Sequence, residues 1–226
     1  MFKLNNRLIS QSIIFYYKMT DFNDKQIQIL QVAETLFAEH GFDGTSIRTI
    51  SKEAKINIAM VSYYFGSKEK LLERLIFFRT SDLKFQLENV SKKEVSPLEK
   101  IENFVTLYIN KIDANRNLYQ ILHYEVSSQK RTIDLKAFTE IKKSNLETLK
   151  SIIEEGQNQN IFKKNIAIPL ITPTILGTYF HFHSNKSYFK EILNLKTEID
   201  YNNYIKTELT THIQQTIKSL LLNESY

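Results

Sequence analysis

The chain has 226 residues, of which 42% are hydrophobic, enough for a packed core in one or two domains. It has no cysteine, which excludes disulfides, Cys-containing metal sites and thiol catalysis. Its net charge of +5 is a weak indication of an anionic partner, and no apolar run reaches the roughly 18 residues of a membrane span, so we expect no membrane association.

Residues 1–18 carry Lys3 and Arg7 ahead of a partly apolar run that polar residues 10–12 interrupt. No small-residue cleavage site follows, which speaks against a secretion signal. We interpret the segment as an upstream extension, with Met19 as the start of the protein. A short added helix is the alternative.

The first predicted helix, Asp24–His40, is amphipathic. Asp24 lies at the positive end of its dipole, and Gly41 is the expected terminator. The apolar residues of this helix, at helical spacing, are Ile27, Leu30, Ala33 and Phe37, with Ile29, Val32 and Leu36 beside them.

Two short helices joined by a tight turn are predicted within residues 45–68. Thr45 is the expected N-cap of the first, Ser46–Ala54. Lys55-Ile56-Asn57 forms the turn, its last residue capping the second helix, and Gly66 ends that helix.

The second short helix has one apolar edge, Val61 and Phe65, which are four residues apart. Its free edge carries Ala59 and Tyr63, and such small and aromatic residues suit insertion into a DNA major groove. The three helices of residues 24–68 therefore predict a small bundle. Its expected core is Leu30, Phe37, Ile47, Ile50, Val61 and Phe65.

Charge is distributed unevenly between these helices. Residues 24–43 have one lysine against four carboxylates, a net charge of −3. Residues 44–70 have five basic and two acidic residues, a net charge of +3. The basic charge therefore lies on the segment predicted to bind DNA, although chance clustering on a solvated surface is an equal alternative from charge alone.

Three spaced blocks carry a resemblance to a known family. They are Ile29-Leu30-x-x-Ala33-x-x-Leu36-Phe37-x-x-x-Gly41-Phe42, Thr45-Ser46-Ile47-Arg48-x-Ile50 and Val61-Ser62-Tyr63-Tyr64-Phe65-Gly66-Ser67-Lys68-Glu69-x-Leu71. With these blocks, residues 24–75 resemble the N-terminal domain of the tetracycline-repressor (TetR) family. The family usually has glycine where Lys55 stands, and a left-handed lysine costs about 1 kcal/mol, so we expect the turn to be slightly altered. An aromatic residue is common where Ser62 stands.

The resemblance implies an all-α protein with a helix-turn-helix DNA-binding domain at residues 22–68 and a ligand-binding and dimerisation domain at 69–226. It implies a ligand-responsive transcriptional regulator, a repressor released by a small apolar effector. We expect a cytoplasmic homodimer that binds a palindromic operator in double-stranded DNA.

We expect Lys68 and Tyr64 to hold phosphates, and Tyr63 and Arg48 to reach base edges. The full set of expected DNA contacts is Thr45, Ser46, Arg48, Ile58, Ala59, Met60, Ser62, Tyr63, Tyr64 and Lys68. The alternative is a non-DNA-binding helical ligand carrier or interaction protein with a degenerate helix-turn-helix. The presence of the four named residues favours the regulator.

Long helical patterns fill the rest of the chain, with loops expected at Lys92–Ser96 and Glu191–Asp200. The predicted helices are Lys68–Val90, one that begins at Pro97, Asn117–Ser127, Ile133–Gln157, Ile166–Tyr188 and Asp200–Leu222. The last two are expected to pair with their copies in a four-helix dimer interface.

We find no catalytic constellation, no cofactor motif and no metal-ligand spacing, so we expect neither an enzyme nor a metalloprotein. His181 and His183, two apart, would face one side of a strand but not of a helix, and packing explains them better. An effector pocket is implied by the resemblance. Core packing explains any one of its candidate lining residues better than a pocket does, and only the resemblance favours the pocket. The candidates are Phe104, Tyr108, Tyr119, His123, Tyr124, Phe138 and Tyr179.

Overall fold

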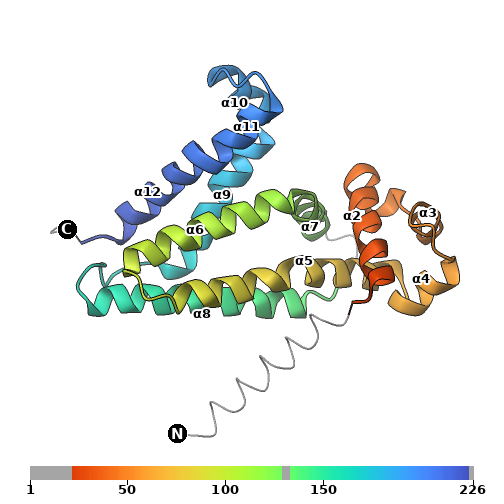
Figure 1. Cartoon of the computed structure of the whole chain (residues 1–226), viewed down its shortest axis with the longest axis horizontal. Helices are drawn as coiled ribbons and strands as arrows, with labels where there is room; N and C mark the ends of the chain where they lie inside the picture. Colours follow the sequence, from red (N-terminus) through yellow and green to blue (C-terminus); the bar gives the residue numbers. More distant parts are fainter. Residues whose placement is uncertain (1–21, 129–132, 224–226) are drawn as a thin grey trace, which may run out of the picture. The chain divides into compact units, whose positions relative to one another are not determined.

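The computed structural model describes residues 22–128 and 133–223, so the predicted extension at residues 1–18 lies outside the described residues. All the named elements within these ranges are helical, which confirms the all-α prediction (Figure 1). They are α2 (Asp24–Gly44), α3 (Ile47–Glu53), α4 (Ile58–Phe65), α5 (Lys68–Ser91), α6 (Pro97–Ala114), α7 (Arg116–Ser128), α8 (Lys136–Asn158), the 3₁₀ turn η1 (Ile168–Leu170), α9 (Ile171–Ser184), α10 (Lys186–Ile192), α11 (Glu198–Tyr204), the π-turn η2 (Ile205–Leu209) and α12 (Thr210–Leu221).

The helices divide into two compact units. The first contains the chain up to Ser81 together with residues 115–138, and the second contains residues 82–114 together with 139–226. α5 belongs to both, since its first half lies in the first unit and its second half in the second.

The first unit has a core built from α2, α3, α4, the first half of α5, and α7. Five of the six core residues predicted for the bundle are buried, and Ile47 is partly buried against them. α7 adds Leu118, Ile121 and Leu122 to the same core. The first unit is therefore larger than the 22–68 segment, because α7 covers an apolar face of α2 that the short helices leave open.

The beginning and end of α2 follow from its caps. Asn23 accepts a hydrogen bond from the backbone N–H of Gln26, whose side chain accepts one from the backbone N–H of Asn23, a capping box. Gly41 has a φ of 70°, a conformation that glycine adopts without a steric penalty, and it interrupts the helix where the sequence predicts its end.

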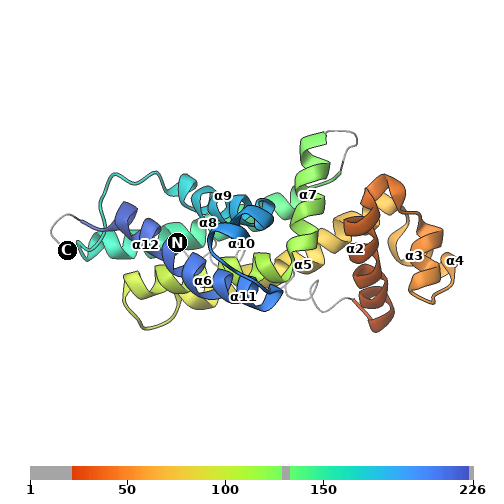
Figure 2. The same cartoon turned by 90° about the horizontal axis from the view of Figure 1, so that it is seen from above.

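The second unit packs α6 against α12 and α9 (Figure 2). Its apolar core is bordered by polar contacts between helices: the Lys100 ammonium contacts both carboxylate oxygens of Glu155, at 2.9 and 2.7 Å. Gln214 of α12 donates to the backbone oxygen of Glu102 and to the Thr106 hydroxyl of α6. These side chains fix the relative rotation of α6, α8 and α12.

Two predicted helices of this unit differ from the structure. The span Ile166–Tyr188 contains η1 and α9, and then a break at Asn185 before α10 begins. The last helix begins earlier than predicted, at Glu198, where Thr197 and Asp200 form a capping box, and it passes through the π-turn η2 before α12. Sequence spacing missed both features because apolar residues continue at helical spacing through them.

α8 and α10 each end in a left-handed turn of the same kind. Asn160 (φ 58°) and Asn194 (φ 54°) occupy the left-handed position. In each case the following N–H reaches back to a carbonyl five residues earlier, Ile161 to Gly156 and Leu195 to Lys190. Asparagine tolerates this conformation better than most residues, so the sequence suits both turns.

Candidate nucleic-acid interface

The turn between α3 and α4, like the ends of α8 and α10, has one residue in the left-handed conformation, and here that residue is a lysine. Lys55 has a φ of 52°, the left-handed conformation, whereas a slightly altered turn was expected. Its N–H donates to Lys52 O at 3.1 Å, and the Ile56 N–H donates to Ser51 O at 3.0 Å. Both bonds close the end of α3, so the turn keeps its glycine-type geometry despite the side chain, at a cost of about 1 kcal/mol.

The turn is held from both sides. The Gln28 side chain of α2 donates to Ala54 O at 3.0 Å, just before the turn. Asn57 accepts a hydrogen bond from the Ala59 N–H at 2.8 Å and caps α4, as predicted. Val61 and Phe65 are buried, so one edge of α4 is anchored in the core.

The opposite edge of α4 faces solvent with unusually large apolar side chains. Tyr63 is 84% exposed, Ile58 47% and Met60 38%. Ala59 and Ser62 are exposed between them, and Tyr64 is partly buried with its ring 5.6 Å from that of Tyr63. Such a surface on a capped helix needs a partner to account for it.

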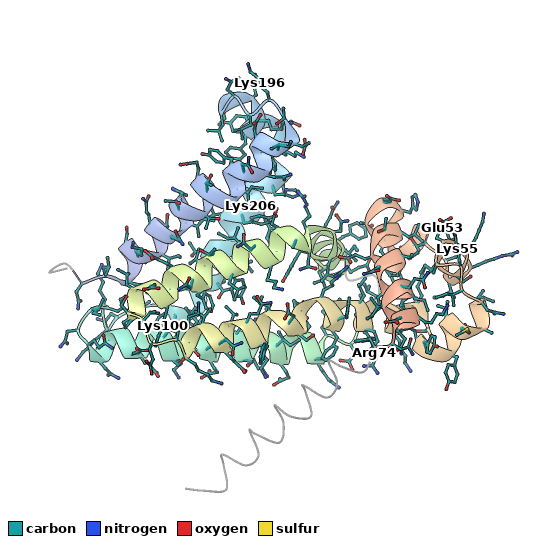
Figure 3. All side chains as sticks on the ribbon, in the orientation of Figure 1. Glu53, Lys55, Arg74, Lys100, Lys196 and Lys206 are labelled. Carbon is teal, nitrogen blue, oxygen red and sulfur yellow. The ribbon has the colours of Figure 1, made fainter. Side chains whose placement is uncertain are left out.

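Basic side chains border this edge. Arg48 and Lys52 of α3 are exposed, and so is Lys55, which projects outward beside Glu53 (Figure 3). The predicted contacts include Arg48 but neither lysine, and the positive net charge of residues 44–70 makes both lysines further candidates.

Thr45 departs from its predicted roles. Ser46, and not Thr45, caps α3, accepting a hydrogen bond from the Thr49 N–H at 3.0 Å. Thr45 is 1% exposed, and its hydroxyl donates to Leu36 O at 3.0 Å. Its side chain belongs to the corner after α2 and is not presented to DNA in this structure, whereas Ser46 is exposed.

Lys68 also makes contacts that the sequence did not indicate. Its ammonium donates to Phe42 O and to Thr45 O, both at 2.8 Å, and lies 4.3 Å from the centre of the Phe42 ring. Two of its three N–H donors are therefore directed at the protein and not at a phosphate.

The candidate effector residues fall into both units. Tyr119, His123, Tyr124 and Phe138 belong to the first, where Tyr124 is exposed and the His123 side chain lies outside the described residues. The other three belong to the second unit and are buried; they are Phe104, Tyr108 and Tyr179.

Both tyrosines among the three buried aromatics have hydrogen-bonded hydroxyls. The Phe104 and Tyr108 ring centres lie 5.0 Å apart, and the Tyr179 hydroxyl donates to Asp113 at 2.8 Å. Burial raises the pKa of Tyr108 to about 12, against a lowering by hydrogen bonds from Asn145 and Thr172. The phenol is therefore neutral at physiological pH.

Asn145 is a buried polar residue beside Tyr108 that the sequence analysis did not single out. It is 4% exposed, and its side-chain N–H donates to the Tyr108 hydroxyl at 3.2 Å. Its Oδ1 has no hydrogen-bond partner among the residues that the structure describes. An asparagine four residues from Ile141 and from Leu149, within an apolar stripe, was the available signal.

The two histidines of α9 pack against aromatic rings. His183 stacks on Tyr179 and its Nδ1 lies 3.4 Å from the Tyr201 hydroxyl, while His181 meets the edge of Phe189. Within residues 22–128 and 133–223 no three His, Asp or Glu side chains gather as metal ligands do. Across the same ranges, each helix is too short or too polar to cross a lipid bilayer.

A short helix with an exposed apolar edge, held by a preceding helix and a tight turn, defines a helix-turn-helix protein. The comparisons with known proteins agree. Residues 29–75 match the family of "Bacterial regulatory proteins, tetR family", and residues 97–216 match the "Tetracyclin repressor-like, C-terminal domain". The chain therefore belongs to the TetR family of transcriptional regulators.

Individual relatives cover most of the chain. The transcriptional repressor NicS of Pseudomonas putida is 31% identical over 169 residues, 70% of this chain and 75% of NicS. The probable transcriptional regulator YttP of Bacillus subtilis is 29% identical over 182 residues, 72% of this chain and 84% of YttP. The structure of FadR from Bacillus subtilis in complex with stearoyl-CoA aligns over 85% of this chain and 97% of FadR, with a TM-score of 0.65 and 20% identity, which shows a common fold.

Proposed function

We propose that the protein is a repressor that binds a palindromic DNA operator as a cytoplasmic homodimer and releases it when a small apolar effector binds. The observation that carries the DNA-binding part is the exposed edge of α4. Its exposed Tyr63 stands beside Ile58 and Met60, on a helix whose other edge is buried. That arrangement suits a helix that enters a groove.

The chemistry of this edge suggests how sequence would be read. Ile58, Ala59 and Met60 have no side-chain hydrogen-bond donors, so thymine methyl groups and DNA shape would dominate their contribution. Tyr63 and Arg48 are the candidates for hydrogen bonds to base edges. Tyr64, Ser46 and Ser62 are candidates for phosphate contacts, and the neighbouring lysines strengthen attraction to any duplex.

Selection of DNA fragments by the purified protein, followed by sequencing, tests the proposal. We expect enrichment of a palindrome whose half-site centres are about one helical turn, or a multiple, apart. Tyr63→Ala should then weaken operator binding about 10- to 100-fold with little change on random DNA. Gln31→Ala, at an exposed position of α2 outside the proposed contacts, is the control. Fragments without any common sequence would argue against a specific regulator.

Dimerisation through α9 and α12 is part of the proposal and follows the family resemblance. Gly177 of α9 is exposed, and a side chain added there would meet no atom of the chain within 4 Å. Gly177→Glu should therefore leave the folded protomer intact but convert the dimer to monomer. Sedimentation at micromolar concentration measures this, and a wild-type monomer there would count heavily against the dimer.

The proposal of an effector site rests on the buried rings of Phe104 and Tyr108 in the second unit and on Asn145 beside them. We propose that an effector replaces packing around Phe104 and Tyr108 and offers a hydrogen-bond donor to Asn145 Oδ1, the acceptor without a partner among the described residues. Long-chain acyl-CoA and steroid ketones are sensible first probes, since FadR was solved with stearoyl-CoA and KstR2 of Mycobacterium tuberculosis is described as a ketosteroid transcriptional regulator. A compound that both raises the melting temperature and releases operator DNA would support the proposal. If none in a broad apolar panel does both, the residues are ordinary core.

A further inference from the structure

The corner between α2 and α3 has carbonyl groups at the negative end of α2 and no basic residue of its own. The last turn of α2 contains none. The chain bends at Gly41, and the Thr45 N–H returns to Phe42 O at 3.2 Å, so that this carbonyl lies at the negative end of the helix. A cation placed here is favoured by the helix dipole.

Lys68, from the first turn of α5, supplies that cation. Its ammonium lies between Phe42 O and Thr45 O, 2.8 Å from each, and above the Phe42 ring. Phe42 is itself fixed, because its ring stacks on Phe37 with centres 5.2 Å apart in the core. Charge-assisted hydrogen bonds of this length are about twice as strong as neutral ones.

These contacts join the two ends of the DNA-binding segment. α3, the turn and α4 all lie between Thr45 and Lys68, which are 23 residues apart. Bonding the end of this segment to its beginning closes it into a loop that carries α4. The orientation of α4 then depends on the closure as well as on the buried edge formed by Val61 and Phe65.

We infer that Lys68 is a positioning residue for DNA recognition, whose ammonium closes the 45–68 segment and holds α4 in its reading orientation. This inference rests on the proposed DNA binding. It differs from the phosphate role expected from the sequence. A phosphate contact strengthens binding to any duplex, whereas an orientation matters only where α4 must meet particular base edges.

The test compares Lys68→Met with Lys70→Met, which removes an exposed lysine from the same turn of α5. Anisotropy titrations on the selected operator and on a random duplex, each over a range of KCl concentrations, give affinity, specificity and salt slope. They are run well below the melting temperature of each variant, with circular dichroism as a check on folding.

We expect Lys68→Met to reduce operator affinity about 10- to 100-fold, the range of one charge-assisted hydrogen bond, and to leave random-duplex affinity and the salt slope as in Lys70→Met. Phe42→Leu retains the charge but removes the ring beneath it, so it should lower the operator-to-random ratio in the same direction. A loss of folded protein alone would not change that ratio.

An equal loss on both duplexes, with a salt slope lowered by about 0.9, would mean a phosphate contact and overturn the inference. An unchanged operator-to-random ratio in both Lys68→Met and Phe42→Leu would overturn it too. Wild-type protein that does not distinguish operator from random DNA would instead refute the proposed function, and the inference with it.

Discussion

Gly156 makes the closest packing contact of any glycine in the described part of the chain, and replacing it tests the packing of the second unit. A Cβ added there would lie 2.1 Å from Phe162 Cδ2 and 2.4 Å from Cε2. The ring is 1% exposed and cannot move aside easily. The residues on either side of Phe162 are hydrogen-bonded to the end of α12 and the residues after it. The Lys163 N–H donates to Leu221 O at 2.8 Å, and the Asn223 N–H donates to Ile161 O at 3.1 Å.

We therefore expect Gly156→Ala to destabilise the protein. Forcing a methyl group into such a site costs about 1–3 kcal/mol. Alanine in a helix is otherwise favoured over glycine by about 0.5–1 kcal/mol. Because a 2.1 Å approach is a severe overlap, the upper half of that cost, about 2–3 kcal/mol, applies, and the net loss in the free energy of unfolding should be about 1–2.5 kcal/mol. Urea titration at a fixed protomer concentration measures it, because a dimer would make stability depend on concentration.

Two further variants make the reasoning refutable. Glu147→Ala, at an exposed position of the same helix, should stay within about 0.5 kcal/mol of wild type. In a Phe162→Ala background the clash is absent, so Gly156→Ala should become stabilising by about 0.5–1 kcal/mol. The same destabilisation in both backgrounds would show that contact with Phe162 is not its cause.

Three other predictions concern strain, charge and pH. Lys55→Gly should be more stable than Lys55→Ala by about 1 kcal/mol in urea titration, because both lose the lysine but only glycine relieves the left-handed turn; equal midpoints would mean that the turn is unstrained. Arg79→Met should cost about 2–3 kcal/mol, since it leaves the buried Glu34 carboxylate without the guanidinium that donates to it at 2.7 and 2.9 Å, whereas Lys143→Met, in an exposed pair with Glu140, should cost under about 0.5 kcal/mol. The pKa of Tyr108 is raised to about 12, so the unfolded chain releases its phenol proton near pH 10 while the folded chain retains it. The free energy of unfolding should therefore fall by about 3 kcal/mol between pH 10 and 12. Tyr108→Phe should remove this part of the fall in unfolding curves at pH 9 and 11.

The amino-acid sequence alone determined the positions of most helices and which edge of α4 is exposed. Spacing of three and four residues, caps such as Asn57 and the break at Gly41 are local, and each decides structure within one or two turns. The same locality explains why Val61 and Phe65 were found buried and Tyr63 exposed.

Tertiary structure decided the contacts that join distant parts of the chain. The sequence does not show that the Lys68 ammonium finds two backbone carbonyls, since carbonyls are present at every residue and only the corner after α2 aims two of them at one point. Likewise, a threonine before a helix is a plausible cap, and only the packed corner shows that Thr45 turns inward.

The division into units was also decided by packing. α7 is remote in sequence from α2, and its place in the first core depends on which apolar faces remain uncovered after the short helices have packed. Asn145 lies on an apolar stripe that sequence spacing identifies, but only the packed structure shows that its Oδ1 has no hydrogen-bond partner among the described residues. Local patterns specify which residues form helices and which face is apolar, whereas the partner of each face depends on the shapes of all the others.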